Sequence, residues 1–188
     1  MPRVAEQPLD TGDTAVRSVF DRFAAEGREP IALYRVLAAA PWLLAAYNGL
    51  AVAMRHEATL PRGLRELAIL RGAQLAGSDY EWSHHVPMAR AAGVPESQLS
   101  RLHAWRTSPD FDARERAALT CVEAVHDATM GDDDFALLRA SFSEAETVEL
   151  VGVCAFYEMV ARLIQAFGIE VEPSYARHLD EVPRQPPD

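Results

Sequence analysis

The chain has 188 residues, enough for one domain with a substantial core, and 49% of them are hydrophobic while 24% are charged. Its formal net charge of -10 argues against a nucleic-acid surface, because phosphate binding needs a positive field. We find no apolar run of the roughly 18 residues that a membrane span needs, and no apolar segment of a signal peptide. The two cysteines, Cys121 and Cys154, provide no disulfide framework. We therefore expect a cytoplasmic protein without membrane or nucleic-acid partners.

The N-terminal third predicts an arm followed by three helices. Residues 1–12 are polar and contain two prolines, which indicates a flexible arm. Apolar residues then recur at helical spacing over 14–25, 31–39 and 41–56, and the Gly-Arg-Glu-Pro segment at 27–30 separates the first helix from the second.

The stretch 60–93 predicts two helices joined by a tight turn. Pro61 is favoured at the first position of a helix, and Gly77 supplies the left-handed stop. Ser78 and Glu81 have the S-x-x-E spacing of a capping box, in which each side chain accepts a backbone N–H at the start of the second helix.

Further helices are expected at 94–105, 112–129, just after the acidic turn 131–134, and at 144–167. The last of these is apolar around most of its circumference, which predicts burial at the centre of the fold or between subunits. The proline-rich segment 171–188 is expected to form an extended tail.

No segment shows the alternation of a half-buried strand, so the predicted fold class is all-α. We expect a single helical domain over 13–170, between the arm 1–12 and the tail 171–188. Its apolar helical surface exceeds the need of one small bundle, which favours a homo-oligomer.

Three segments of the chain resemble the carboxymuconolactone decarboxylase family, which includes the alkylhydroperoxidase D-like proteins: LRELAIL at 64–70, GSDYEWSHH at 77–85 and AGV at 92–94. The peroxidase branch of that family has a Glu, a Cys-x-x-Cys twelve residues later and a His four residues beyond the second Cys. The corresponding positions here hold Glu66, Ser78, Glu81 and His85. The resemblance implies a bundle of about seven to nine helices that assembles as a homo-oligomer, from dimer to hexamer.

Glu81 and His85 are the first candidates for proton transfer, because residues four apart share one helix face. A carboxylate one turn from an imidazole orients the ring and selects its tautomer. Alternatively, Glu81 only completes the capping box and His85 is an exposed partner. Glu66 occupies the position of the functional glutamate of the family, or is a solvated partner of Arg62.

The candidate substrate-binding residues are Tyr80, His84, Arg71 and Ser78. Tyr80 offers a hydrogen bond to a substrate oxygen or serves as packing, and His84 points about 100° away from His85 around the helix. Arg71 is a possible anchor for a carboxylate or a solvated side chain. Ser78 caps a helix and is not expected to be a nucleophile. Adjacent histidines lack the usual metal-binding spacing, so we rank a metal below acid–base chemistry without a cofactor.

The resemblance implies a cofactor-independent lyase that decarboxylates or isomerises a small carboxylate- or lactone-bearing molecule. His85 would donate or shuttle the proton, while Glu66 and Glu81 would orient and tune it. One alternative is an alkylhydroperoxidase-like (peroxiredoxin-type) antioxidant oxidoreductase, which needs Cys121 or Cys154 near His85, since serine and glutamate cannot form a sulfenic acid or a disulfide. The other is a non-catalytic oligomeric ligand-binding protein.

Overall fold

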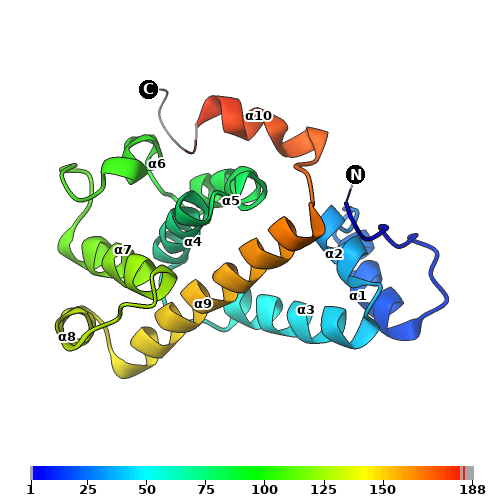
Figure 1. Cartoon of the computed structure of the whole chain (residues 1–188), viewed down its shortest axis with the longest axis horizontal. Helices are drawn as coiled ribbons and strands as arrows, with labels where there is room; N and C mark the ends of the chain where they lie inside the picture. Colours follow the sequence, from blue (N-terminus) through cyan, green and yellow to red (C-terminus); the bar gives the residue numbers. More distant parts are fainter. Residues whose placement is uncertain (1, 183, 185–188) are drawn as a thin grey trace.

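A computed structural model describes residues 2–182 and 184, and within this part of the chain the fold consists of α-helices and one 3-10 turn, with no strand. The all-α prediction is confirmed. The helices are α1 (Thr14–Ala25), α2 (Ala32–Leu37), α3 (Pro41–His56), α4 (Arg62–Ala76), α5 (Asp79–Ala91), α6 (Glu96–Arg101), η1 (Leu102–Ala104), α7 (Ala113–His126), α8 (Asp132–Ser141), α9 (Glu144–Phe167) and α10 (Pro173–Glu181) (Figure 1).

Side-chain caps start several of these helices where the sequence predicts them. The carboxylate of Asp13 accepts the first N–H groups of α1. Capping boxes start α7 and α9, formed by Asp112 with Glu115 and by Ser143 with Glu146. These caps satisfy backbone donors that have no partner inside the helix.

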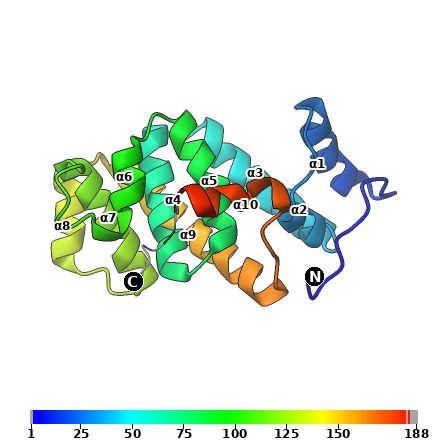
Figure 2. The ribbon, with the colours of Figure 1, turned by 90° about the horizontal axis from the view of Figure 1, so that it is seen from above.

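The long helix α9 crosses the middle of the molecule (Figure 1). It packs against α4 and α7, and α4 also packs against α5, so that α4 is enclosed on several sides. Helices α1 to α3 pack together at the other end of α9, and α10 lies across α5 (Figure 2). This arrangement brings α3, α5 and α9 around one region of the core.

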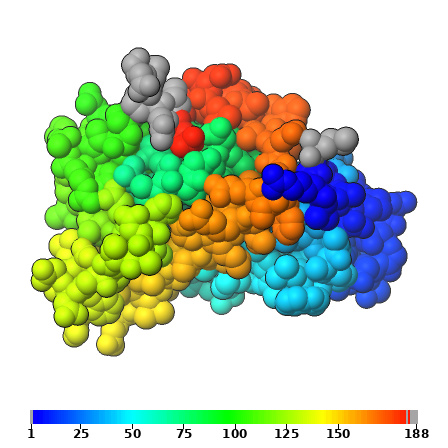
Figure 3. All heavy atoms as spheres, in the orientation of Figure 1, coloured from blue at the N-terminus to red at the C-terminus, as the bar shows by residue number. Residues whose placement is uncertain are grey.

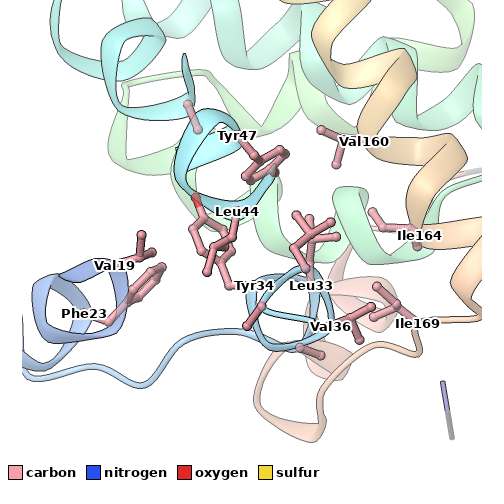
Figure 4. Packing of buried hydrophobic residues seen from close by; sticks show 14 of the residues in the cluster. Val19, Phe23, Leu33, Tyr34, Val36, Leu44, Tyr47, Val160, Ile164 and Ile169 are labelled. Atoms are coloured by element: carbon pink, nitrogen blue, oxygen red, sulfur yellow. The ribbon is translucent and has the colours of Figure 1, made fainter. Parts of the chain in front are cut away.

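That region is bounded by a cluster of buried aromatic and aliphatic side chains from α1, α2, α3 and α9 (Figure 4). Tyr34 meets Tyr47 edge-on at a centroid distance of 5.4 Å, and Tyr47 stacks on Phe156 at 5.2 Å. Two other clusters fill the space around α4, α5 and α7. The aromatic cluster forms one wall of the candidate site.

Our expectation that no segment is apolar and long enough to span a membrane was wrong for α9. This helix has 24 residues and a mean hydropathy of 1.5 over its most apolar window, of which 39% is buried inside the fold. Core helices of soluble proteins reach the same values, and α9 packs on α4 and α7 and carries the ion-paired Glu158. The membrane-like composition therefore fits the central position of α9 in the bundle.

The prediction of an extended tail was also wrong for its first part, because α10 forms there. Pro173 occupies the start of α10, where a missing N–H costs nothing, and His178 is buried on its inner face. The prolines at 183, 186 and 187 lie outside the described residues. With α10, the described part of the chain holds more helices than the seven to nine that the resemblance implies.

The arm 2–12 forms no helix, but hydrogen bonds attach it to the rest of the fold. The backbone N–H of Arg3 donates to the carbonyl of Phe167 at 2.7 Å, and the N–H of Gln7 donates to Arg35 at 3.0 Å. Figure 3 shows this segment lying against the end of α9.

Candidate functional site

The turn between α4 and α5 places the candidate residues. Gly77 adopts a left-handed conformation with φ 67° and ψ 30°, which suits a residue without a Cβ. The N–H of Ser78 then donates to the carbonyl of Ala73 at 2.9 Å, and its hydroxyl accepts the N–H of Glu81 at 3.4 Å. Helices α4 and α5 consequently pack side by side.

Only half of the predicted capping box at this turn is formed. The N–H of Ser78 is already bonded to Ala73, so the carboxyl group of Glu81 does not cap it. Glu81 is instead buried, and its Oε2 atom has no hydrogen-bond partner among the described residues. The carboxyl group is therefore available for another role.

Glu66, rather than Glu81, orients His85. The Oε2 atom of Glu66, on α4, lies 2.8 Å from Nδ1 of His85, on α5, and both side chains are buried. The ring of Tyr157 contacts the imidazole edge-on, with the centroids 5.0 Å apart. A carboxylate at Nδ1 fixes the tautomer with the proton on that nitrogen, which leaves Nε2 as a proton acceptor.

His85 and Glu81 both line a cavity of about 70 Å³. The other polar or aromatic side chains around it are Arg55, His84, Tyr34, Tyr47, Tyr80 and Tyr157. Apolar lining comes from Ile31, Leu33, Ala51, Met88 and Val160. Glu66 does not line the cavity and lies behind His85, so it acts on the site through the imidazole.

Burial dominates the electrostatics of this cavity. It raises the pKa of Glu81 to about 8, a shift that the hydroxyl of Ser78 only partly opposes. Burial also raises the pKa values of Tyr34, Tyr47 and Tyr157 above their usual range. At neutral pH the cavity thus holds a neutral carboxylic acid and neutral phenols, all of which can donate hydrogen bonds.

Tyr80 and His84 belong to a neighbouring network centred on Glu172, just before α10. The hydroxyl of Tyr80 donates to Oε1 of Glu172 at 2.9 Å and accepts the N–H of Leu33 at 3.3 Å. Nε2 of His84 lies 3.1 Å from Oε2 of Glu172, an ion-pair distance, although the two atoms are not aligned for a hydrogen bond. Burial alone would raise the pKa of Glu172, but His84 and the N–H of Ala32 outweigh it and lower the pKa to about 2.

Two of the predicted substrate-binding residues do not reach the cavity. Arg71 is engaged by Glu123, whose Oε1 atom lies 2.6 Å from Nη2, and by Gln74 at 3.0 Å. Ser78 is buried at the turn and occupied by its helix cap. Neither residue lines the space beside His85.

Arg55 and Tyr157 also line the cavity, although neither was predicted from the sequence as a site residue. Arg55 lies in the last turn of α3, and Tyr157 lies in the middle of α9. Tertiary packing alone brings them to the α4–α5 pair, so no local spacing marks them. The one feature of the sequence that could have marked them as site residues is that each is a polar side chain on a mostly apolar helix.

The two thiols lie in a different part of the core. Cys121 and Cys154 are 1% and 6% exposed, belong to the cluster between α4, α7 and α9, and do not line the cavity. A hydrogen bond from Cys154 lowers the pKa of the Cys121 thiol. Within 2–182 and 184, no group of three or more His, Cys, Asp or Glu side chains is arranged to hold a metal ion.

Part of the chain matches a known protein family. The carboxymuconolactone decarboxylase family model matches residues 38–124, which include Glu66, Glu81 and His85. The uncharacterized protein YdfG of Bacillus subtilis (strain 168) is 28% identical over 98 residues, which are 50% of this chain and 67% of YdfG.

Solved structures extend the likeness to almost the whole chain. A cysteine-to-alanine variant of the debrominase Bmp8 in complex with 2,3,4-tribromopyrrole superposes with a TM-score of 0.81 at 22% identity, covering 94% of this chain and 95% of Bmp8. The AhpD-like protein of unknown function ATU0492 from Agrobacterium tumefaciens is 27% identical, with a TM-score of 0.68 over 72% of this chain and 94% of that chain. The alkylhydroperoxidase AhpD core of a peroxidase-related protein from Ralstonia eutropha JMP134 gives a TM-score of 0.79 at 18% identity, over 99% of this chain and 98% of that chain. Residues 38–124 therefore match the carboxymuconolactone decarboxylase family, and the fold of the chain is that of the alkylhydroperoxidase D-like proteins.

Proposed function

We propose that this protein is a cofactor-independent acid–base enzyme that decarboxylates or isomerises a small carboxylate- or lactone-bearing organic molecule. The observation that carries the proposal is the pairing of two groups with different tasks around one cavity. His85 is held by Glu66 with Nε2 left free, while Glu81 keeps its proton at neutral pH. Acid–base enzymes commonly use a pair of titratable groups whose environments move their pKa values apart, so that one acts as the acid and the other as the base.

Each proton has a place in this scheme. In an isomerisation, Nε2 of His85 removes a proton from carbon, the electron pair moves into an enolate, and Glu81 returns a proton at the new position. In a decarboxylation, the C–C bond breaks, carbon dioxide leaves, and the resulting enolate carbon takes a proton from Glu81. His85 then returns a proton to Glu81, the one it took from carbon in the isomerisation or one taken from solvent in the decarboxylation. The neutral phenols of Tyr47 and Tyr157 are suited to donate hydrogen bonds to the enolate oxygen.

The cavity restricts what can react. A volume of about 70 Å³ is well below the roughly 300 to 1,000 Å³ typical of sites for drug-sized ligands. It therefore accommodates only the reacting part of a substrate, while the remainder stays outside.

A peroxidase of the Cys-x-x-Cys type receives no support from the chemistry of this site. Ser78 and Glu81 occupy the corresponding positions, and both cysteines lie in another cluster. Without a thiolate beside His85, no group of the cavity can reduce a peroxide by forming a sulfenic acid. The debrominase structure is that of a cysteine-to-alanine variant of Bmp8, and this chain has no cysteine in its cavity.

The proposal is tested with a panel of small lactone acids and unsaturated carboxylic acids incubated in deuterium oxide. Release of carbon dioxide is followed by mass spectrometry and C–H to C–D exchange by NMR. We expect at least one compound to react, and His85→Gln to slow the reaction by about 100-fold or more. Leu9→Ala, in the arm, is the control and should retain full activity.

Two outcomes would contradict the proposal. Unchanged turnover in His85→Gln would remove the imidazole from the mechanism. Binding of panel compounds with neither exchange nor carbon dioxide release would instead indicate the non-catalytic ligand-binding protein.

A further inference from the structure

Outside the inner cavity, basic side chains gather around a second pocket, of about 410 Å³, between α5 and α10. Arg28, Arg62, Arg177, His84 and His178 contribute to its lining, and no aspartate or glutamate does. The whole chain has 28 Asp and Glu residues against 18 Lys and Arg residues, so a lining without a carboxylate runs against its overall charge. Glu172 and Glu181 lie at ion-pair distance from His84 and His178, so the three arginines are the charges that favour an anion here.

The arginines keep hydrogen-bond donors for a ligand. Arg28 uses one terminal nitrogen for Glu26, at 3.1 Å, and Arg62 makes only a long contact of 3.7 Å with Glu66. Within the described part of the chain, Arg177 has no carboxylate at ion-pair distance and contacts only the ring of His178, at 3.5 Å. Each guanidinium carries five N–H groups in a fork that matches a carboxylate, so several remain unused.

The two pockets share a wall. His84 and Met88, one turn apart on α5, line both the basic pocket and the inner cavity. The imidazole of His84 is held between the rings of Tyr80 and Tyr175, with centroid distances of 4.2 and 3.8 Å. The basic pocket therefore adjoins the inner cavity, which contains His85 and Glu81, at these two side chains.

We propose that the basic pocket binds the carboxylate of an organic anion whose second, reacting group enters the inner cavity. The substrate class is then a molecule with an anionic group separate from the group that loses or gains a proton. The role of the inner cavity in this inference rests on the proposed function, whereas anion binding by the arginines does not. The larger outer pocket thus accepts the part of the substrate that the inner cavity excludes.

The test uses benzoate as the carboxylate probe, benzamide as its uncharged counterpart and inorganic phosphate as a simple anion. Binding to the full chain is followed by the NMR signal of the Met88 methyl group, labelled with carbon-13 and assigned by Met88→Leu. We expect benzoate to shift this signal and to bind more tightly than benzamide or phosphate. Its affinity should fall when sodium chloride rises from about 20 to about 200 mM.

Arg177→Gln should raise the Kd for benzoate roughly three- to tenfold, because it removes one charged hydrogen-bonding partner at a partly solvated site. Arg139→Gln, an exposed arginine on α8 far along the chain from the pocket, is the matched control and should leave the Kd unchanged. Equal binding of benzoate and benzamide, or equal losses in the two variants, would overturn the inference. Phosphate binding as tightly as benzoate would overturn the assignment to an organic anion.

The two proposals fail in different ways. If Arg177→Gln weakens benzoate binding but no compound of the reaction panel turns over, the basic pocket stands and the proposed function falls. If compounds turn over with a KM that Arg177→Gln does not change, the proposed function stands and the basic pocket falls.

Discussion

At the scale of single residues, the carboxyl group of Glu81 is subject to two opposing effects. It lies in the first turn of α5, where the helix dipole favours a negative charge by about 0.3 to 1 kcal/mol. Burial without a partner for Oε2 opposes that charge and is the stronger effect, since the pKa rises to about 8. Glu81 thus has the residue type that a capping box requires, but its buried environment makes it a protonated acid at neutral pH.

A stability change follows from this raised pKa. Between the usual value of 4.5 and about 8, folded Glu81 holds a proton that the unfolded chain releases, so Glu81 makes the fold progressively less stable as pH rises through this range. Glu81→Gln removes the proton uptake and should raise the free energy of unfolding at pH 7 by up to about 3 kcal/mol. Urea unfolding at pH 5 and pH 8 measures this gain.

The gain should be much smaller at pH 5 than at pH 8. Asp79→Asn, an exposed neighbour in the same turn of α5, provides the control and should show no comparable pH-dependent difference. A gain for Glu81→Gln that is independent of pH would mean that Glu81 is ionised in the folded protein throughout this range.

The sequence predicted which residue types meet at the site but not how they pair. Glu66, Glu81 and His85 were predicted as one catalytic group; Glu81 and His85 line the cavity, whereas Glu66 does not and contacts His85 instead. Helix spacing favoured Glu81 as the partner of His85, whereas the side chain that reaches Nδ1 is Glu66 from the adjacent helix. Spacing within one helix cannot rank a contact across two helices, and the same reason explains why Arg55 and Tyr157 were missed.

At the scale of secondary-structure elements, local signals predicted most boundaries. Pro41 starts α3, Gly77 ends α4 and Gly168 ends α9, each in the conformation that its residue type favours. The exception is α10, where a proline-rich composition indicated an extended chain. A single proline at the start of a helix is compatible with that helix, and burial of His178 against the fold stabilises the turns that follow.

The α4–α5 turn offers a test at this scale. Gly77 has φ 67°, and a Cβ added there would meet no atom within 4 Å, so only backbone strain opposes a side chain. Gly77→Ala should therefore lower the free energy of unfolding by about 1 to 2 kcal/mol. Gly49→Ala, inside α3 and equally free of neighbours, should raise it by roughly 0.5 to 1 kcal/mol.

Thermal and urea unfolding of the two variants give the comparison. Opposite signs are expected, because the same methyl group strains a left-handed turn and favours a helix interior. A Gly77→Ala protein as stable as the parent would show that the turn does not require its left-handed geometry.

At the scale of the whole molecule, the absence of strand-like alternation predicted the all-α class, and the apolar pattern of 144–167 predicted burial at the centre of the fold or between subunits. Homo-oligomerisation remains a prediction. Large apolar side chains stay exposed on α3 and α9, with Trp42 at 74% and Val148 at 72% of their full exposure. These two side chains are therefore the positions at which we test for a contact with another copy of the chain.

If these side chains lie in a subunit interface, Val148→Lys and Trp42→Lys should each reduce self-association. Sedimentation velocity across a range of protein concentrations measures the effect. Leu9→Lys, which replaces an exposed apolar residue of the arm, is the matched control and should leave the oligomer intact. A monomeric parent protein at every concentration would contradict the prediction of a homo-oligomer.

The most direct test of the central claim is a pH titration of the glutamate side-chain carboxyl carbons by carbon-13 NMR, with Glu81 assigned from the signal that is missing in Glu81→Gln. We expect this one carboxyl group to titrate near pH 8, because its cavity keeps it protonated at neutral pH beside His85. A titration of Glu81 near its usual value of 4.5 would show a carboxylate in the cavity at neutral pH, and it could not then serve as the acid.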